Sequence, residues 1–320
     1  MTRSREFLQQ YAEVGIYHPP LADETGRLVG NNGDRLILAG TQRIYKDLGV
    51  KLVDRPEDAG LIVIGGNGGM IETFKVIPGI FRRYCQEYPN TPLCVLPSSF
   101  YYPTRPLAED IGQRSAPVVL FCRERISYDH LLHDHGLPEF CSVELDHDHA
   151  FELAGTELVT RLSRAEPKHV LMVERGDIEH PFKSVIHVGS VGRWRKVIPE
   201  RVKTPLRSIV GRARGRKRTA FSTKCETLLR EFYPEYFDWP RVVRDSSDNR
   251  MVDFEQFCMD IAEAAVVFTT RLHVGILAAL LGKPTFLFEG SYHKIRGVYE
   301  FSLASYSNVR LISRHELVMA

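Results

Sequence analysis

The hydrophobic residues of this chain fall into short uninterrupted runs, without strict alternation of apolar and polar positions. The clearest runs are followed by turn residues and lie at 61–66, 93–99, 118–124, 141–146, 169–175, 241–245, 265–270 and 285–290. Such runs of β-branched and aliphatic residues predict strands that are buried on both faces of a sheet. Helical patterns lie between many of them, at 70–88, 128–136 and 253–265. Strands that alternate with helices predict an α/β fold with parallel sheets.

The predicted strands are too numerous for one comfortable sheet. We therefore expect two Rossmann-like, doubly wound domains, with a boundary in the polar stretch 155–168. This places one domain over residues 1–160 and the other over residues 161–320. In open α/β sheets of this kind, ligands bind at the carboxyl ends of the strands.

Composition excludes several classes of protein but indicates no particular binding partner. The 320 residues are enough for two domains, and the formal net charge of +2 does not by itself select a polyanion. No apolar stretch approaches the roughly 18 residues of a membrane span, and the first residues lack the apolar core of a secretory signal. The six cysteines are scattered and form no C-x-x-C pair, so neither a zinc ribbon nor a disulfide framework is predicted. We expect a protein of the cytoplasm.

The stretch TTRLHVGILAALLGKP, residues 269–284, carries the most informative polar residues. We expect a strand that ends at 270 and a helix over about 272–281, capped by Thr269 or Thr270 and closed by Gly282. Arg271 and His273 then lie at the start of the helix, where unpaired N–H groups suit an anion.

Two interpretations of this helix start compete. Arginine can clamp a phosphate or carboxylate, and histidine can move a proton near neutral pH. The alternative is a capped core helix with two incidental polar residues. The helix dipole disfavours cations at this end, and a local misfit of this kind favours a functional site.

Together with other short motifs, this stretch resembles the polysaccharide pyruvyl transferase family. The C-terminal signature is T-x-RLH, a helix of small residues, GKP, a strand and K-x-R, within 269–296. The other motifs follow in the family's order: N-x-GD at 31–38, a strand with a glycine loop at 61–70, R-[DE]-x-x-S at 122–136, D-x-A at 144–150 and R-x-D-x-E at 174–179. The resemblance covers roughly 31–300 and implies two Rossmann-like domains facing a cleft, as in the GT-B-like glycosyltransferases.

The resemblance also implies a reaction. Phosphoenolpyruvate would be the donor, its pyruvate would join two hydroxyls of a sugar as a ketal, and phosphate would leave. No cofactor and no metal is implied. By resemblance His273 would be the general acid, and Arg123, Arg271 and Lys294 would bind the donor, with Arg296 a weaker candidate. The first domain would then be the acceptor side and contribute Arg123, and the second would be the donor side.

Four residues of the N-terminal half are candidates for the acceptor side of the cleft: Asn32, Asp34, Gly66 and Asn67. For Asp34 the alternative is helix capping, with Asn31 or Asn32 as the N-cap. The loop GGNGGM, residues 65–70, either lines the cleft or forms a tight turn, and it lacks the full dinucleotide-binding pattern.

Several features depart from the family pattern or stay ambiguous. Glu124 stands where the family usually has aspartate, and His293 is an additional histidine. Ser246 and Ser247 follow a predicted strand and either contact phosphate or form a plain turn. Five histidines lie close together in sequence, but solvated surface histidines are a better interpretation than a metal site; they are His130, His133, His135, His147 and His149.

The segment 192–218 is an insertion with eleven basic residues and one acidic residue. One interpretation is a solvated loop. The sharper hypothesis is a membrane-surface element with a basic face for anionic headgroups and an apolar face for the acyl boundary. That would suit a lipid-linked oligosaccharide acceptor at the inner face of the membrane. Nucleic acid is not expected, since Trp194 is the single stacking aromatic among the arginines.

The sequence therefore predicts a cytoplasmic pyruvyl transferase of surface polysaccharide or exopolysaccharide biosynthesis. One alternative is a nucleotide-sugar-dependent glycosyltransferase of the same two-domain fold. Another is a non-catalytic, membrane-associated scaffold, against which the joint presence of Arg123, Arg271, His273 and Lys294 argues.

We expect this enzyme in the cytoplasm; under the membrane-surface hypothesis for 192–218, it would also contact the inner face of the membrane peripherally.

Overall fold

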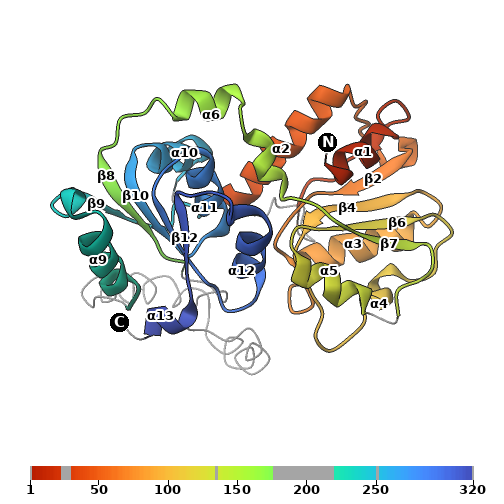
Figure 1. Ribbon diagram of the computed structural model, residues 1–320. Helices are drawn as coiled ribbons and strands as arrows, with labels where there is room; N and C mark the ends of the chain where they lie inside the picture. Colours follow the sequence, from red (N-terminus) through yellow and green to blue (C-terminus); the bar gives the residue numbers. More distant parts are fainter. Residues whose placement is uncertain (1, 23–29, 134–135, 176–219, 250–251, 319–320) are drawn as a thin grey trace, which may run out of the picture.

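The computed structural model describes residues 2–22, 30–133, 136–175, 220–249 and 252–318 (Figure 1). The basic segment 192–218, with the membrane hypothesis built on it, lies outside these residues, as do His135 and the end of the 174–179 motif. None of the helices in the described ranges combines the length and apolarity that crossing a bilayer requires.

The N-terminal half is built on a five-stranded parallel sheet in the order β1-β2-β4-β6-β7. Its strands are β1 (Ile16–Tyr17), β2 (Leu61–Ile64), β4 (Leu93–Ser98), β6 (Val118–Cys122) and β7 (Cys141–Leu145). One core contains side chains of α1 (Arg3–Gln9) and α2 (Asn32–Leu48) with one face of the sheet. A second contains side chains of α3 (Val76–Glu87), α4 (Ala108–Ile111) and α5 (Arg125–Leu132). Both faces of the sheet are therefore covered.

The short elements of this half connect its strands and helices. Two two-residue strands, β3 (Met70–Ile71) and β5 (Phe100–Tyr101), pair in parallel beside the main sheet. Turns of 3-10 helix lie at η1 (Pro56–Asp58) and η2 (His149–Leu153). The helix expected over 70–88 is shorter than predicted, because β3 and a turn occupy its first residues and α3 begins at Val76.

The C-terminal half holds a second five-stranded parallel sheet, in the order β12-β11-β10-β8-β9. Its strands are β8 (His169–Val173), β9 (Arg241–Val243), β10 (Ala264–Thr269), β11 (Thr285–Phe288) and β12 (Val309–Ile312). Since the chain first adds β9 on one side of β8 and then β10 on the other, the strand order reverses between β8 and β10. Ligands of open α/β sheets bind at such a switch point.

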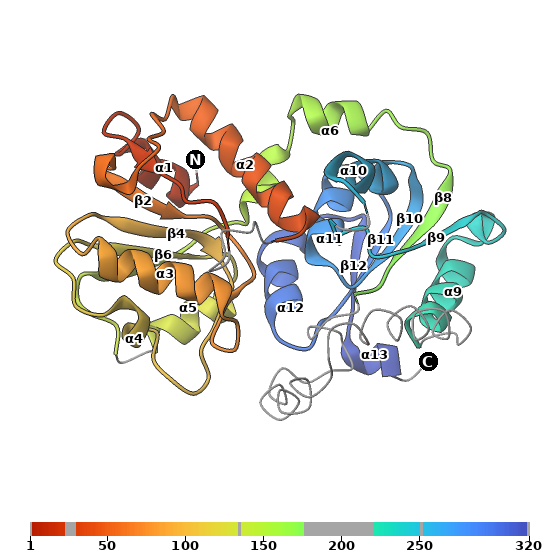
Figure 2. The same cartoon turned by 180° about the vertical axis from the view of Figure 1, so that it is seen from behind.

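Helices cover both faces of the second sheet. The helices α6 (Glu157–Leu162), α10 (Phe254–Ala262) and α11 (Leu272–Leu280) share a core with one face. The helices α9 (Ala220–Phe232) and α13 (Arg314–Val318), with η4 (Pro234–Tyr236), lie on the other. A five-residue helix, α12 (Lys294–Val298), continues into a π-helical turn, η5 (Tyr299–Leu303). Figures 1 and 2 both place α12 on the side that faces the N-terminal half.

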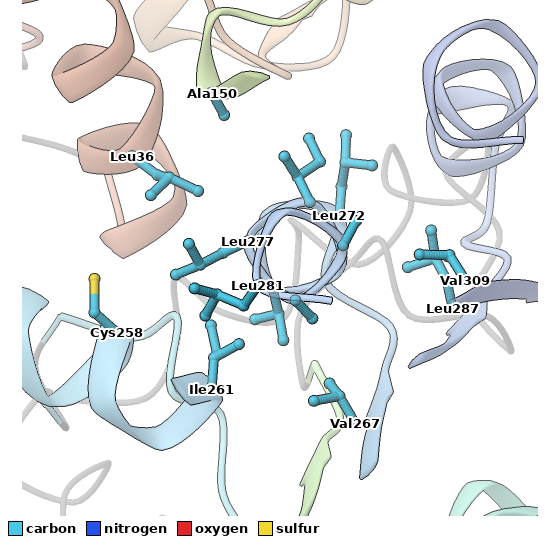
Figure 3. Close-up of a cluster of buried hydrophobic side chains, with 14 of the residues drawn as sticks. Leu36, Ala150, Cys258, Ile261, Val267, Leu272, Leu277, Leu281, Leu287 and Val309 are labelled. Carbon is cyan, nitrogen blue, oxygen red and sulfur yellow. The ribbon is translucent and has the colours of Figure 1, made fainter. Parts of the chain in front are cut away.

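The helix α11 is buried because its sequence is apolar on every side. Figure 3 shows Leu272, Leu277 and Leu281 around this helix, with Leu36 of α2 and Ala150 of η2 nearby. These residues belong to one buried cluster, so the core of the C-terminal half includes side chains from the first 160 residues. The two halves therefore meet directly at the start of α11.

The α/β class with parallel sheets is confirmed, and each of the eight apolar runs overlaps a strand of one of the two main sheets.

Candidate functional site

The candidate site lies where β8 and β10 end, at the switch point of the second sheet. Arg175 follows β8, and Arg271 and His273 follow β10. The backbone N–H of Arg175 donates to Thr270 Oγ1 at 2.9 Å, which ties the two strand ends together. These residues line a cavity of about 250 Å³ whose walls come from both halves of the chain.

The start of α11 differs from the expected capping. Thr269 and Thr270 do not cap the helix, because Arg271 is the N-cap residue and has extended backbone angles. Thr269 Oγ1 instead accepts from the backbone N–H of Arg271 at 2.9 Å, and Thr270 is used by the neighbouring strand. Within the described residues Arg271 makes no side-chain cap, so N–H groups of the first turn remain suited to an anion. The expected C-terminal glycine is confirmed, with Gly282 at a φ of 69°.

Arg271 is held in place by one carboxylate. Its Nε donates to Asp245 Oδ1 at 3.0 Å, and its Nη2 donates to Asp245 Oδ2. A bidentate pair of this kind fixes the plane of the guanidinium. Its side chain is 13% exposed, so Arg271 lines the cavity with little freedom to move.

His273 belongs to a buried chain of charged groups that crosses between the halves. Its Nε2 lies 3.3 Å from Asp148 Oδ2, and the same oxygen accepts from Arg123 Nη1 at 2.7 Å. Asp148 and Arg123 have no exposed side-chain surface. Asp148 Oδ1 accepts from the backbone N–H of Ala150 at 2.8 Å, so both carboxylate oxygens are bonded.

The charge state of Asp148 follows from these contacts. Burial alone would raise its pKa, but His273, Arg123 and the Ala150 N–H hold the pKa well below its usual range. The carboxylate therefore stays ionised at neutral pH. The contact with this ionised carboxylate fixes the orientation of the His273 ring.

Two cationic nitrogens converge on Gly68. A side-chain carbon at this position would lie 2.8 Å from Arg123 Nη2 and 3.1 Å from Lys294 Nζ, so glycine leaves room for both. Arg123 Nη2 is buried and has no hydrogen-bond partner among the described residues. Tyr292 closes this side, since its hydroxyl donates to the carbonyl of Gly68 at 3.2 Å. A buried N–H group without a protein partner is suited to a ligand oxygen.

The start of α2 forms the N-terminal wall of the cavity. Asn31 and Asp34 form a reciprocal capping box, which confirms the capping interpretation, and both residues also line the cavity. Gly33 lies against His273, because a side-chain carbon there would be 2.5 Å from His273 Nδ1. The helix start therefore both borders the cavity and sets the position of the histidine.

Most of the predicted site residues lie in or beside one of two cavities. Arg271, His273, Lys294, Asp34 and Asn67 line the cavity. Arg123 is buried beside it at Gly68, and Gly66 lines a second cavity.

Two further candidates serve other contacts in the structure. The buried side chain of Asn32 donates to backbone carbonyls of the loop that includes Ser246 and Val252, so it ties α2 to the C-terminal half. Arg296 pairs with Glu289 and Glu300 and is 57% exposed.

The second cavity adjoins the first and differs in character. It has a volume of about 440 Å³ and shares Leu21, Gly30, Asn31 and Asp34 with the first cavity. Its other lining residues include many apolar side chains, among them Pro19, Pro20, Ile37, Leu38 and Leu52.

Sequence reasoning assigned no role to three residues that the structure brings to the site. Asp148 and Arg175 lie within motifs, but the spacing of those motifs did not reveal the contact of Asp148 with His273. No sequence pattern indicated a role for Tyr292. Ser247, left open between a phosphate contact and a turn, lines the cavity, and its Oγ has no partner among the described residues.

Fold and site together define an α/β protein with a cavity at a strand switch point that is lined by several cationic side chains. The chain belongs to the polysaccharide pyruvyl transferase family, whose pattern matches residues 31–292. This confirms the resemblance drawn from the motifs, and it indicates a transferase that acts on polysaccharide.

The individual proteins that are similar to the chain include one curated relative and one solved structure. A Bacillus subtilis (strain 168) protein named "Putative pyruvyl transferase EpsO" is 28% identical over 117 residues, which cover 32% of this chain and 36% of that protein. The match thus spans about a third of the relative's length. A crystal structure of the functionally uncharacterized protein KP1_0663 from Klebsiella pneumoniae subsp. pneumoniae NTUH-K2044 superimposes with a TM-score of 0.59. It is 17% identical and covers 97% of both chains, which establishes a shared fold.

Proposed function

We propose that this protein transfers pyruvate from phosphoenolpyruvate to two hydroxyls of a sugar, forming a ketal in exopolysaccharide biosynthesis. The single observation that carries the proposal is the position of His273. It lies in a small cavity beside an ionised aspartate, and Arg271 and Lys294 line the same cavity. Phosphoenolpyruvate carries a carboxylate and a phosphate, and guanidinium and ammonium groups are suited to both.

The cavity volume also supports a small donor. At about 250 Å³ it is smaller than the roughly 300–1,000 Å³ typical of pockets for drug-sized ligands. Phosphoenolpyruvate has few atoms and two anionic groups. A nucleotide sugar would extend out of this cavity into its apolar neighbour.

In the proposed reaction His273 acts as the general acid. Its Nε2 faces Asp148, so Nδ1 is the nitrogen assigned to the donor. Protonation of the methylene carbon of phosphoenolpyruvate gives a methyl group and leaves C2 electron-deficient. The first sugar hydroxyl adds to C2 and loses its proton, which restores the imidazolium.

The second hydroxyl then displaces the phosphate. A bond forms from its oxygen to C2 as the bond from C2 to the phosphate oxygen breaks, and the phosphate leaves with the second proton. No electrons are gained or lost overall. Arg123, Arg271 and Lys294 stabilise the charge of the leaving phosphate and of the carboxylate.

We assign the acceptor to the second cavity. Asp34 lines both cavities, so it lies where an acceptor hydroxyl would approach the donor. The two halves then take the roles of acceptor side and donor side, as in GT-B-like transferases. The lipid-linked acceptor and the membrane contact at 192–218 remain hypotheses from the sequence.

Calorimetric titration with phosphoenolpyruvate, beside a panel of nucleotide sugars, tests the donor. We expect binding of phosphoenolpyruvate and none of the nucleotides. Phosphate release is then measured with the bound donor and a panel of oligosaccharide acceptors. Binding of a nucleotide sugar in place of phosphoenolpyruvate would contradict the proposal and favour a glycosyltransferase.

A further inference from the structure

Two consecutive residues of the N-terminal half face two consecutive residues of the C-terminal half. Arg123 and Lys294 converge on Gly68, as described above. Their neighbours Glu124 and His293 form a second pair, with Glu124 Oε1 3.5 Å from His293 Nε2. A pair of like charges therefore lies beside a pair that can carry opposite charges.

The Glu124 carboxylate is held from several directions. It is fully buried, and Oε2 accepts from the backbone N–H of Ser127 at 2.8 Å. The Ser127 hydroxyl donates to Oε1 and lies 3.4 Å from His293 Nε2. On α12, a side-chain carbon at Gly297 would be 3.0 Å from Glu124 Oε2. Because His293 and Gly297 are four residues apart, they share one face of the helix, and that face lies against Glu124.

The imidazole of His293 is also enclosed by aromatic rings. Its ring centroid lies 5.5 Å from that of Tyr101 and 5.4 Å from that of Tyr292. Burial would raise the pKa of Glu124, but His293 and Ser127 hold that pKa below its usual value. The glutamate is therefore ionised, and its carboxylate contacts His293 across the two halves.

We propose that Glu124 and His293 form a clasp that positions Arg123 and Lys294 around one anionic group of the donor. Two cations that share a small volume repel each other, and Asp148 offsets this repulsion only through its pair with Arg123, so a tendency to separate remains. The clasp opposes that separation because each of its residues is next in sequence to one of the cations. Glu124 and His293 are thus positioning residues. The inference rests on the proposed function only for the identity of the anion.

Binding of two anions tests the clasp. Dissociation constants for phosphoenolpyruvate and for inorganic phosphate are measured by calorimetry in the parent and in His293→Phe, Glu124→Gln and the double variant. Phenylalanine keeps a ring against Tyr101 and Tyr292, and glutamine keeps an acceptor for the Ser127 N–H. We expect each single change to weaken phosphoenolpyruvate binding by about tenfold. The double variant should be little weaker than either single one, since the pair acts as a unit.

The matched control is His147→Phe. His147 stacks on Phe301 at 4.7 Å and hydrogen-bonds to the Ser302 hydroxyl, but it does not line the cavity. This variant should bind phosphoenolpyruvate like the parent. His293→Gln serves as a second variant if the phenylalanine disturbs folding, which thermal unfolding reports.

A spectroscopic readout separates positioning from general destabilisation. The ³¹P chemical shift of phosphoenolpyruvate bound at saturation should change in His293→Phe and stay unchanged in His147→Phe. Unaltered dissociation constants in both single variants, or effects that multiply in the double variant, would overturn the clasp.

The two proposals fail in different ways. If the parent binds inorganic phosphate but not phosphoenolpyruvate, the proposed function fails. The clasp is then tested by the dissociation constants for inorganic phosphate in the same variants. If the parent binds neither anion, both proposals are overturned.

Discussion

The two adjoining cavities differ in size and in the chemistry of the residues that line them. The first is small, draws its walls from both halves and contains Arg175, Arg271, His273 and Lys294. The second is larger, and nearly all of its walls come from the first 66 residues, with Asn249 from the C-terminal half. The first cavity is lined by charged side chains that carboxylates hold in place. The second cavity is lined by many apolar side chains. A transferase that joins a small anion to a larger acceptor needs both kinds of surface side by side.

The comparison predicts that the chemistry depends on the first cavity. His273→Ala should lower phosphate release by about 10²- to 10⁴-fold, because a general acid typically contributes this much. Phosphoenolpyruvate binding should persist, since the arginines and Lys294 remain. Calorimetry and phosphate release measured on the same preparation check the prediction. Equal turnover in variant and parent would remove His273 from the reaction.

A smaller change, Gly33→Ala, should disturb the same step without replacing a charged side chain. The added carbon would lie 2.5 Å from His273 Nδ1 and must push the ring aside. Displacement by about 1 Å costs turnover on the order of 100-fold. Gly79→Ala is the matched control, because nothing lies within 4 Å of its added carbon. That control should keep full turnover and gain about 0.4–1 kcal/mol of stability in chemical denaturation.

Donor binding should distinguish the cations of the two cavities. Arg271→Ala should weaken phosphoenolpyruvate binding by roughly tenfold, in line with the loss of one charge-assisted hydrogen bond. Arg35→Ala makes the same chemical change in the second cavity and should leave the donor dissociation constant as it is. Similar losses in both variants, measured by calorimetry, would mean that net charge rather than placement determines binding.

The smallest expected effect concerns the apolar cavity. Leu38 lines it and is 42% exposed. Leu38→Gln should raise the KM for the acceptor by about threefold, as expected for losing part of one apolar contact, and leave donor binding unchanged. Leu132→Gln is the control, since Leu132 is 54% exposed and lines neither cavity. A raised donor dissociation constant in Leu38→Gln would break the division between the cavities.

The sequence was most informative where structure is local. The apolar runs predicted the main strands apart from β1 and β12, because a strand buried on both faces needs a continuous apolar run. Of the two missed strands, β1 has only two residues, and β12 contains the exposed Arg310. The capping of α2 by Asn31 and Asp34 was also predictable, since it depends on residues three apart.

The parts of the site that could not be predicted depend on contacts between the halves. Asp148 Oδ2 contacts Arg123 and His273, which are 25 and 125 positions away in the chain. No local sequence pattern predicts contacts over such separations. Thr269 and Thr270 looked like caps because capping is a local rule, but pairing with the neighbouring strand end gave Thr270 another partner. Glu124 and His293 were noticed as departures from a pattern, and the fold brings them together.

The course of helix α2 limits where this chain can be divided into separate units. Ile44 and Tyr45 near its end pack into the core of the N-terminal half, while Leu36 near its start packs into the core of the other half. Figure 2 shows the helix running from one half to the other. A cut after residue 160 would separate the two sheets and leave the second without Leu36 and Ala150. Recombination with a relative would therefore have to exchange α2 and η2 together with the C-terminal sheet, so the units of exchange in this molecule differ from its sheets.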